Sequence, residues 1–226
     1  MEIREIQERI QQAAVRAGRK GEDIRIMAVT KLQPWEAVRE AYNAGIRIFG
    51  ENRVQEAREK YRDPLPGMEL HLIGHLQTNK VKYIPSLFPW VDSIDRLSIA
   101  EELEKRFAAH NSRLNVLLEV NTSGEPSKTG YASCEELLRD LEQILSFPHL
   151  KIRGLMTVGA LTGDRDAVRK SFRTLSQCFE DLKKRYPEGM WDTLSMGMSS
   201  DFEIAVEEGS TLVRLGTLLF GERVKQ

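Results

Sequence analysis

Short apolar runs and amphipathic helical stretches alternate along this 226-residue chain, and this alternation restricts the folds that it can adopt. Eight runs rich in Ile, Leu, Val and Met are predicted as strands, at 24–30, 46–50, 69–73, 90–94, 116–120, 152–156, 193–196 and 211–214. Because parallel strands are joined by long crossovers, usually helices, the alternation predicts a parallel sheet. Eight such units predict a closed (β/α)8 TIM barrel of the α/β class.

An additional amphipathic helix is predicted ahead of the first strand, because Ile3, Ile6 and Ile10 recur at helical spacing and Gly18 follows as a stop signal. Further helices are predicted at 35–45, 99–109, 134–145, 165–185 and 202–208. Since no linker separates these elements, residues 1–226 are expected to form a single domain. An open, doubly wound sheet is the alternative fold. It usually has a glycine-rich turn after its first strand, whereas residues 30–34 contain no glycine.

The charge composition makes polyanionic partners unexpected. The chain has 33 basic and 34 acidic residues, intermixed, and a formal net charge of −1. We therefore expect neither nucleic acid nor an anionic membrane as a partner, and any anion site has to be local. The amino terminus lacks a leader-like apolar segment, and no apolar run is long enough to span a bilayer. We expect a cytoplasmic protein and, with a leading helix and no second domain, a monomer.

Cys134 and Cys178 are the only cysteines. They lie far apart in sequence, in charged helical stretches, and without the spacing of a zinc or redox motif. Because cytosolic proteins keep most thiols reduced, both are expected to be free.

The strand ends carry the candidate functional residues, because barrels of this class gather such residues at the carboxyl ends of their strands. Lys31 directly follows the first predicted strand, and Val213–Thr217 closes the last one. A partly desolvated lysine carries more of the neutral amine, which can condense with an aldehyde. Together with Arg-x-Gly-Thr at the last strand, it suggests a pyridoxal phosphate pocket. An ordinary solvated lysine is the commoner role at such a position.

The phosphate tail of such a cofactor needs backbone N–H donors. Ser199 and Asp201 precede the predicted helix 202–208, whose first N–H groups can bind phosphate. Gly216 and Thr217 follow the next strand, and phosphate sites in these barrels are often built from the loops after strands seven and eight. The alternative is that Ser200 or Asp201 merely caps this helix.

Two further side chains fit such a pocket. Arg214 lies within the last strand, where a buried guanidinium needs an acceptor. The ring nitrogen of the cofactor and a barrel acid such as Glu119 are equally suitable acceptors. His75 can stack on a flat ring or carry a proton. A hydrogen-bonded loop histidine is the commoner case, and the sequence supplies no evident partner base.

Six segments carry a family resemblance that spans essentially the whole chain. They are Ala28–Lys31, Phe49–Glu56, His71–Lys80, Gly154–Thr157, Leu194–Asp201 and Val213–Gly221. In this order and spacing they resemble the pyridoxal phosphate homeostasis protein family, whose members are single-domain relatives of the barrel domain of bacterial alanine racemase. Six motifs together are far more specific than any one of them.

The resemblance implies a cofactor site with one covalent attachment. Lys31 is implied to form a Schiff base with pyridoxal 5′-phosphate. The other implied contacts are Ser199 and the backbone of Gly216 and Thr217 for the phosphate, Arg214 for the pyridine nitrogen, and Asn52 for the pocket wall. The sequence follows the family pattern at these positions, whereas family members differ at the position of His75.

The family is described as binding the cofactor and balancing its cellular level rather than turning over a substrate. A permanently protonated arginine at the pyridine nitrogen agrees with this, because it discourages ring protonation and weakens the electron sink that amino-acid chemistry requires. The implied function is a non-catalytic carrier that can supply pyridoxal phosphate-dependent apo-enzymes. An amino-acid racemase-like enzyme is the alternative. Larger relatives take its second acid–base group from a separate domain, which we do not expect here because the chain ends at Gln226.

Overall fold

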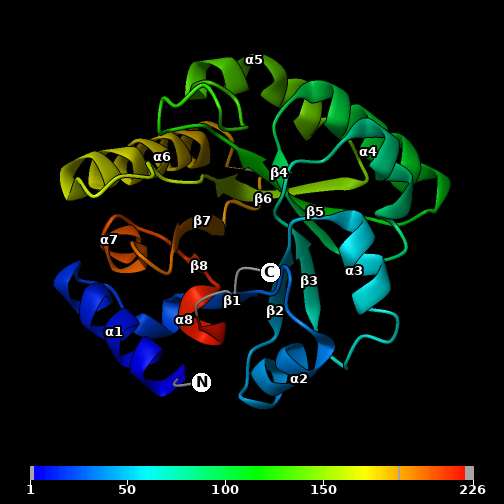
Figure 1. Cartoon of the computed structure of the whole chain (residues 1–226). Coiled ribbons are helices and arrows are strands. Elements are labelled where there is room, and N and C mark those ends of the chain that lie inside the picture. The colour runs from blue at the N-terminus through cyan, green and yellow to red at the C-terminus, as the bar shows by residue number, and fades with distance from the viewer. Residues whose placement is uncertain (1–2, 188, 222–226) are drawn as a thin grey trace.

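The central feature of the computed structural model, which describes residues 3–187 and 189–221, is a closed barrel of parallel strands (Figure 1). The strands are β1 (Arg25–Val29), β2 (Ile48–Glu51), β3 (Glu69–Leu72), β4 (Trp90–Ile94), β5 (Leu114–Glu119), β6 (Leu150–Met156), β7 (Thr193–Met198) and β8 (Leu212–Leu215). Each strand pairs with the next in chain order, and β1 pairs with β8. The predicted (β/α)8 barrel and its eight strands are confirmed.

Helices surround the barrel as an outer layer (Figure 1). They are α1 (Ile3–Arg16), α2 (Trp35–Asn43), α3 (Val54–Lys60), α4 (Leu97–Ala109), α5 (Cys134–Leu145), α6 (Arg165–Arg185), α7 (Phe202–Glu207) and α8 (Thr217–Phe220). The connection between β3 and β4 contains a 3-10 helix, Thr78–Tyr83. The predicted leading helix is confirmed as α1. The expectation about a leader refers to Met1, and the expectation about a further domain refers to Gln226. Both residues lie outside the described part of the chain.

The apolar core has two parts, because alternate side chains of each strand point into the barrel and toward the helices. The larger part lies between the sheet and the surrounding helices. Inside the barrel, Met27, Ile48 and Leu212 form one apolar cluster. Trp90 and Met156 belong to a second. These clusters fill the interior, so that the barrel is a packed core with an open mouth rather than a channel.

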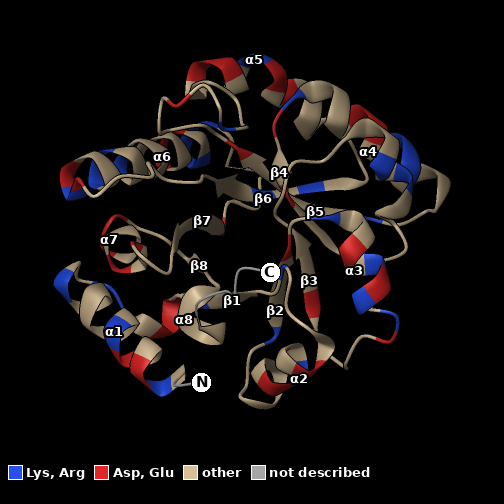
Figure 2. Ribbon diagram, viewed as in Figure 1, with Lys and Arg blue, Asp and Glu red and all other residues tan. Residues whose placement is uncertain are grey.

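Helix α1 is fixed against α7, which lies beside it in Figure 1. Arg9 donates to Glu203 at 3.0 Å and stacks over the ring of Phe202, and Arg16 donates to Glu207 at 2.7 Å. Figure 2 shows basic and acidic residues mixed along α1, α3 and α6. Within the described part of the chain, none of the helices combines the length and the apolar character needed to cross a membrane.

The two cysteines are joined, which makes the expectation of free thiols wrong. Cys134 at the start of α5 and Cys178 in α6 form a disulfide, with their Cα atoms 6.0 Å apart. The residues are 44 positions apart in sequence. Spacing along the chain does not reveal such a pair, because α5 and α6 are brought together only when the strand between them takes its place in the barrel.

Candidate functional site

All six residues of the expected cofactor site line one cavity at the carboxyl ends of the strands. Its volume is about 410 Å³, within the range of small-molecule sites, roughly 300–1,000 Å³. The expected residues are Lys31, Asn52, Ser199, Arg214, Gly216 and Thr217. The remaining lining residues are Val29, Ile73, Val158, Met198 and Ser200. Strand ends far apart in sequence thus form a single mouth with an apolar wall and several polar groups.

Lys31 lies in a turn that begins where β1 ends. The N–H of Gln33 donates to the carbonyl of Thr30 at 3.0 Å, which closes this turn around the lysine. The Lys31 side chain is half-buried and reaches the cavity. A lysine amine at the edge of such a pocket is placed to meet a carbonyl group that binds there.

Ser199 connects the two loops that were expected to hold a phosphate. Its hydroxyl oxygen accepts hydrogen bonds from the N–H of Gly216 at 3.2 Å and from the N–H of Leu218 at 3.3 Å. These amides lie at the start of α8, and Gly216 and Ser199 both line the cavity. Asp201, by contrast, accepts from the N–H of Met198 at 2.6 Å and shapes the loop. Ser199 is therefore a link between loops. Asp201 occupies the N-cap position of α7, but its side chain forms no capping hydrogen bond with this helix.

A sharp backbone turn makes the serine loop possible. Gly197 has a φ of +93°, and a Cβ atom at this position would lie 2.5 Å from the Cβ of Ala205. An L-residue would be strained there and would push α7 away from the end of β7. The glycine thus lets α7 pack close beneath the loop that carries Ser199.

Arg214 is almost completely buried, with 4% of its surface exposed. One terminal nitrogen donates to the carbonyl and hydroxyl oxygens of Ser195, at 2.9 and 2.8 Å, and the other to the carbonyl of Thr157 at 2.7 Å. Burial lowers the pKa of Arg214, while nearby Asp92, Asp201 and Glu119 act in the opposite direction. Neutral acceptors hold the guanidinium, so that a direct ion pair with Glu119 is not the arrangement in this structure.

Asn52 follows β2 and is held close to the end of β3. A Cβ atom on Gly74 would lie 2.3 Å from the carbonyl oxygen of Asn52, so this approach requires glycine. Ile73, the residue before this glycine, contributes an apolar part of the cavity wall. The motif that contains Gly74 therefore fixes both a polar and an apolar side of the pocket.

His75 has a partner that sequence analysis missed. Its Nδ1 lies 2.9 Å from Oδ2 of Asp95, and Arg96 pairs with the other carboxylate oxygen. Asp95 directly follows β4, so its position at a strand end was the available signal. His75 is not among the residues that line the cavity of Lys31.

A charged cluster behind Lys31 was also missed. Lys60 at the end of α3 donates to carboxylate oxygens of Glu51 at 2.8 Å and of Glu56 at 2.9 Å. Glu51 is fully buried and also accepts from the hydroxyl of Thr30 at 2.7 Å. Residues 51–60 contain alternating charges that look like an exposed helix in sequence, and only the barrel shows that three of them meet behind β1.

Glu119 at the end of β5 titrates near neutrality. Its Oε1 accepts from Thr129 at 2.8 Å, and Oε2 is buried without a hydrogen-bond partner among the described residues. Burial, together with the negative charge of Asp95, raises the pKa of Glu119 to about 7, although the Thr129 bond and Arg214 oppose this rise. The folded protein therefore holds a proton on this carboxyl group that the unfolded chain releases near pH 4.5.

This difference predicts a loss of stability with rising pH. A carboxyl group whose pKa is raised by folding stabilises the native state below its unfolded pKa, and this contribution disappears as pH rises through the folded pKa. Between about pH 5 and pH 8 the wild-type free energy of unfolding is expected to fall by about 2–3 kcal/mol more than that of Glu119→Gln. Urea denaturation of both proteins at the two pH values measures this difference, and equal pH dependence would contradict it.

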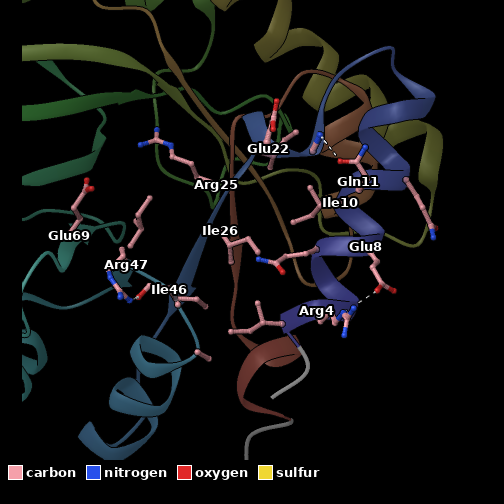
Figure 3. Close-up of a pocket in the computed structure, with 18 residues that line it drawn as sticks. Arg4, Glu8, Ile10, Gln11, Glu22, Arg25, Ile26, Ile46, Arg47 and Glu69 are labelled. Carbon is pink, nitrogen blue, oxygen red and sulfur yellow. Dashed lines mark hydrogen bonds and ion pairs between the residues drawn. The ribbon is translucent and has the colours of Figure 1, made fainter.

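A larger cavity, of about 950 Å³, lies between α1 and the amino ends of β1 and β2 (Figure 3). Its floor includes Ile10, Ile26 and Ile46, and charged side chains of both signs surround it. Arg4 pairs with Glu8 on its α1 side, at 3.8 Å. It is remote from Lys31, at the end of the barrel that contributes to stability rather than to chemistry in this fold.

Comparisons with known proteins agree with this geometry. The family model described as alanine racemase, N-terminal domain, matches residues 2–224. A pyridoxal phosphate homeostasis protein of Aquifex aeolicus is 44% identical over 218 residues, which cover 96% of this chain and 94% of the relative. A solved structure of PipY from Synechococcus elongatus with PLP bound is 35% identical, with a TM-score of 0.82, and covers 96% of this chain and 100% of that one.

A more distant likeness concerns the fold alone. An alanine racemase of Clostridium difficile is 13% identical, with a TM-score of 0.79, and the match covers 97% of this chain and 56% of that one. The family match and the curated relative both extend over nearly the full chain. The chain therefore belongs to the pyridoxal phosphate homeostasis protein family, whose fold is that of the alanine racemase N-terminal domain.

Proposed function

We propose that this protein binds pyridoxal 5′-phosphate in the cavity at the barrel mouth and takes part in the homeostasis of this cofactor. The observation that carries the proposal is the meeting of all six expected residues around one cavity of about 410 Å³. The solved relative PipY with bound PLP supports it, since that chain matches this one over nearly its whole length.

In the proposed site, Lys31 is the covalent attachment point. With the cofactor bound there, its aldehyde would condense with the amine of Lys31 and release one water molecule. Ser199 and the amides of Gly216 and Thr217 hold the phosphate. Arg214 would lie nearest the ring nitrogen, and Asn52 would form part of the wall. The reaction is reversible, so that hydrolysis of the Schiff base returns free cofactor.

We further propose that the protein has no dedicated catalytic turnover. A cationic Arg214 at the ring nitrogen opposes protonation of the ring and so weakens stabilisation of an amino-acid carbanion. A role in the cytosol as a monomer, supplying pyridoxal phosphate-dependent apo-enzymes, fits a mouth that is open to solvent. The names of the curated relatives support homeostasis as the function.

The test is chemical trapping of the loaded wild-type protein. After incubation with pyridoxal phosphate and removal of excess ligand, we expect visible absorbance, and borohydride reduction should label one peptide that contains Lys31. Labelling of another residue, or a colourless protein that borohydride does not label, would reject the proposed site. The measurement uses mass spectrometry of the digested protein and requires no substrate.

An amino-acid racemase-like activity is the second candidate, with Lys31 and another mouth residue as its two acid–base groups. His75, which pairs with Asp95 outside the lining of the Lys31 cavity, is the side chain to test for the second role. Asp95 orients the imidazole, as a carboxylate does in many acid–base sites. Exchange of the α-proton of amino acids in deuterated water distinguishes the candidates. Exchange that requires both Lys31 and His75 supports the enzyme. Loaded protein that exchanges no faster than free cofactor supports the carrier.

A further inference from the structure

The peptide groups on both sides of Lys31 are held by side chains of one helix, α3. Lys60 Nζ donates to the carbonyl oxygen of Thr30 at 2.6 Å, and this carbonyl belongs to the peptide bond that precedes Lys31. Glu56 Oε1 accepts from the N–H of Leu32 at 2.5 Å, and this N–H belongs to the peptide bond that follows Lys31. The two α3 residues thus hydrogen-bond to the peptide groups that precede and follow Lys31.

The two α3 side chains also bond each other, and Lys60 is almost completely shielded from solvent. Lys60 and Glu56 bond each other at 2.9 Å, and the Lys60 side chain is only 8% exposed. Lys60 also reaches Glu51, whose side chain is fully buried, at 2.8 Å. Partial burial acts to raise the pKa of Glu56, but hydrogen bonds from Lys60 and Leu32 outweigh it and leave this pKa lower than usual. The charged carboxylate is therefore available as an acceptor at neutral pH.

The backbone at this point needs such support. Leu32 has a φ of +61°, in the left-handed region that branched residues rarely occupy, and its side chain lies in solvent with 68% exposed. A non-glycine residue in this conformation is strained, and it persists only where its surroundings determine it. Because the Leu32 side chain contributes little packing, the Glu56 bond to its N–H supports this conformation together with the Gln33–Thr30 bond that closes the turn.

We propose that Lys60 and Glu56 are positioning residues that aim the Lys31 amine at the aldehyde of the bound cofactor. This inference rests on the proposed function. Neither residue touches the mouth cavity, whose lining comes from the strand ends and the loops after β7 and β8. They therefore act through the backbone of residues 30–32, whereas phosphate binding depends on a separate part of the mouth.

This separation gives a specific test with two ligands. Pyridoxal phosphate uses both the lysine and the phosphate site, whereas pyridoxine 5′-phosphate has an alcohol in place of the aldehyde and uses only the noncovalent contacts. In Lys60→Met, we expect the affinity for pyridoxal phosphate and the rate of its borohydride-trapped attachment to fall about tenfold or more, because a small displacement of a reacting group is costly. The affinity for pyridoxine 5′-phosphate should remain within about twofold of wild type.

Two further variants complete the experiment. Lys60→Arg keeps a cationic donor and should restore part of the attachment rate. Arg106→Met removes the Glu102–Arg106 pair on α4, bonded at 2.7 Å, and is the matched control for losing an ion pair within a helix. It should leave both ligands unaffected. Unchanged binding of both ligands by Lys60→Met, or an equal loss of both, overturns the inference. Failure of the wild type itself to attach the cofactor at Lys31 would instead reject the proposed function beneath it.

Discussion

Lys31→Ala is expected to abolish borohydride labelling by pyridoxal phosphate and to lower the affinity for this ligand at least about 100-fold, equivalent to about 3 kcal/mol. The cause is loss of the one amine that lines the mouth cavity among the described residues. Affinity for pyridoxine 5′-phosphate should change far less, because Ser199 and the amides at the start of α8 remain. Fluorescence titration with both ligands and mass spectrometry of the reduced protein measure the effect.

Lys105→Ala is a suitable control, because this lysine is exposed on α4 and does not line the cavity. It should label and bind like the wild type. If Lys31→Ala still acquires one stoichiometric label at a different lysine, the assignment of the attachment point is wrong even though the protein binds the cofactor. An equal loss of affinity for both ligands would show that the substitution disturbs the pocket as a whole.

Cys134→Ser is expected to lower the free energy of unfolding of the oxidised protein by roughly 4 kcal/mol. The disulfide joins residues 44 positions apart, and closing a loop of this length in the unfolded chain accounts for a stabilisation of this size. For a protein of this length the midpoint of thermal unfolding should fall by roughly 10 °C. Calorimetry of wild type and variant, each with and without a reducing agent, measures the difference.

The reducing agent separates the bond from the packing of the cysteines. Reduced wild type should resemble Cys134→Ser in its unfolding midpoint, and the variant should not respond to the reductant. A wild-type midpoint that the reductant leaves unchanged would show that the bond does not contribute. The stabilisation belongs to the oxidised protein, because reduction of the bond removes the constraint on the unfolded chain.

The barrel was predictable from the sequence because each strand is a short apolar run and most of the helices carry the period of an amphipathic helix. A closed barrel then places all strand ends at one mouth, so Lys31 and Gly216 can be assigned to the same cavity although they are far apart in the chain. The predicted site residues do share that cavity. Their contacts with the cofactor stay predictions that trapping and titration address.

Other features depend on contacts between elements and leave no periodic signal. The Glu51–Lys60 bond links a strand end to the last residue of a helix, and the Cys134–Cys178 bond links neighbouring helices. The acceptors of Arg214 are backbone carbonyls and a serine hydroxyl, which sequence does not mark as partners of a cation. Spacing can indicate which residues share a mouth, but the pairing of side chains behind it follows from three-dimensional packing.

The two hydrogen bonds that Ser199 accepts have a consequence for how an anion would bind at the mouth. Its hydroxyl oxygen accepts from the N–H groups of Gly216 and Leu218, so these two donors are paired within the protein itself. An arriving anion exchanges one acceptor for another rather than filling a deficit.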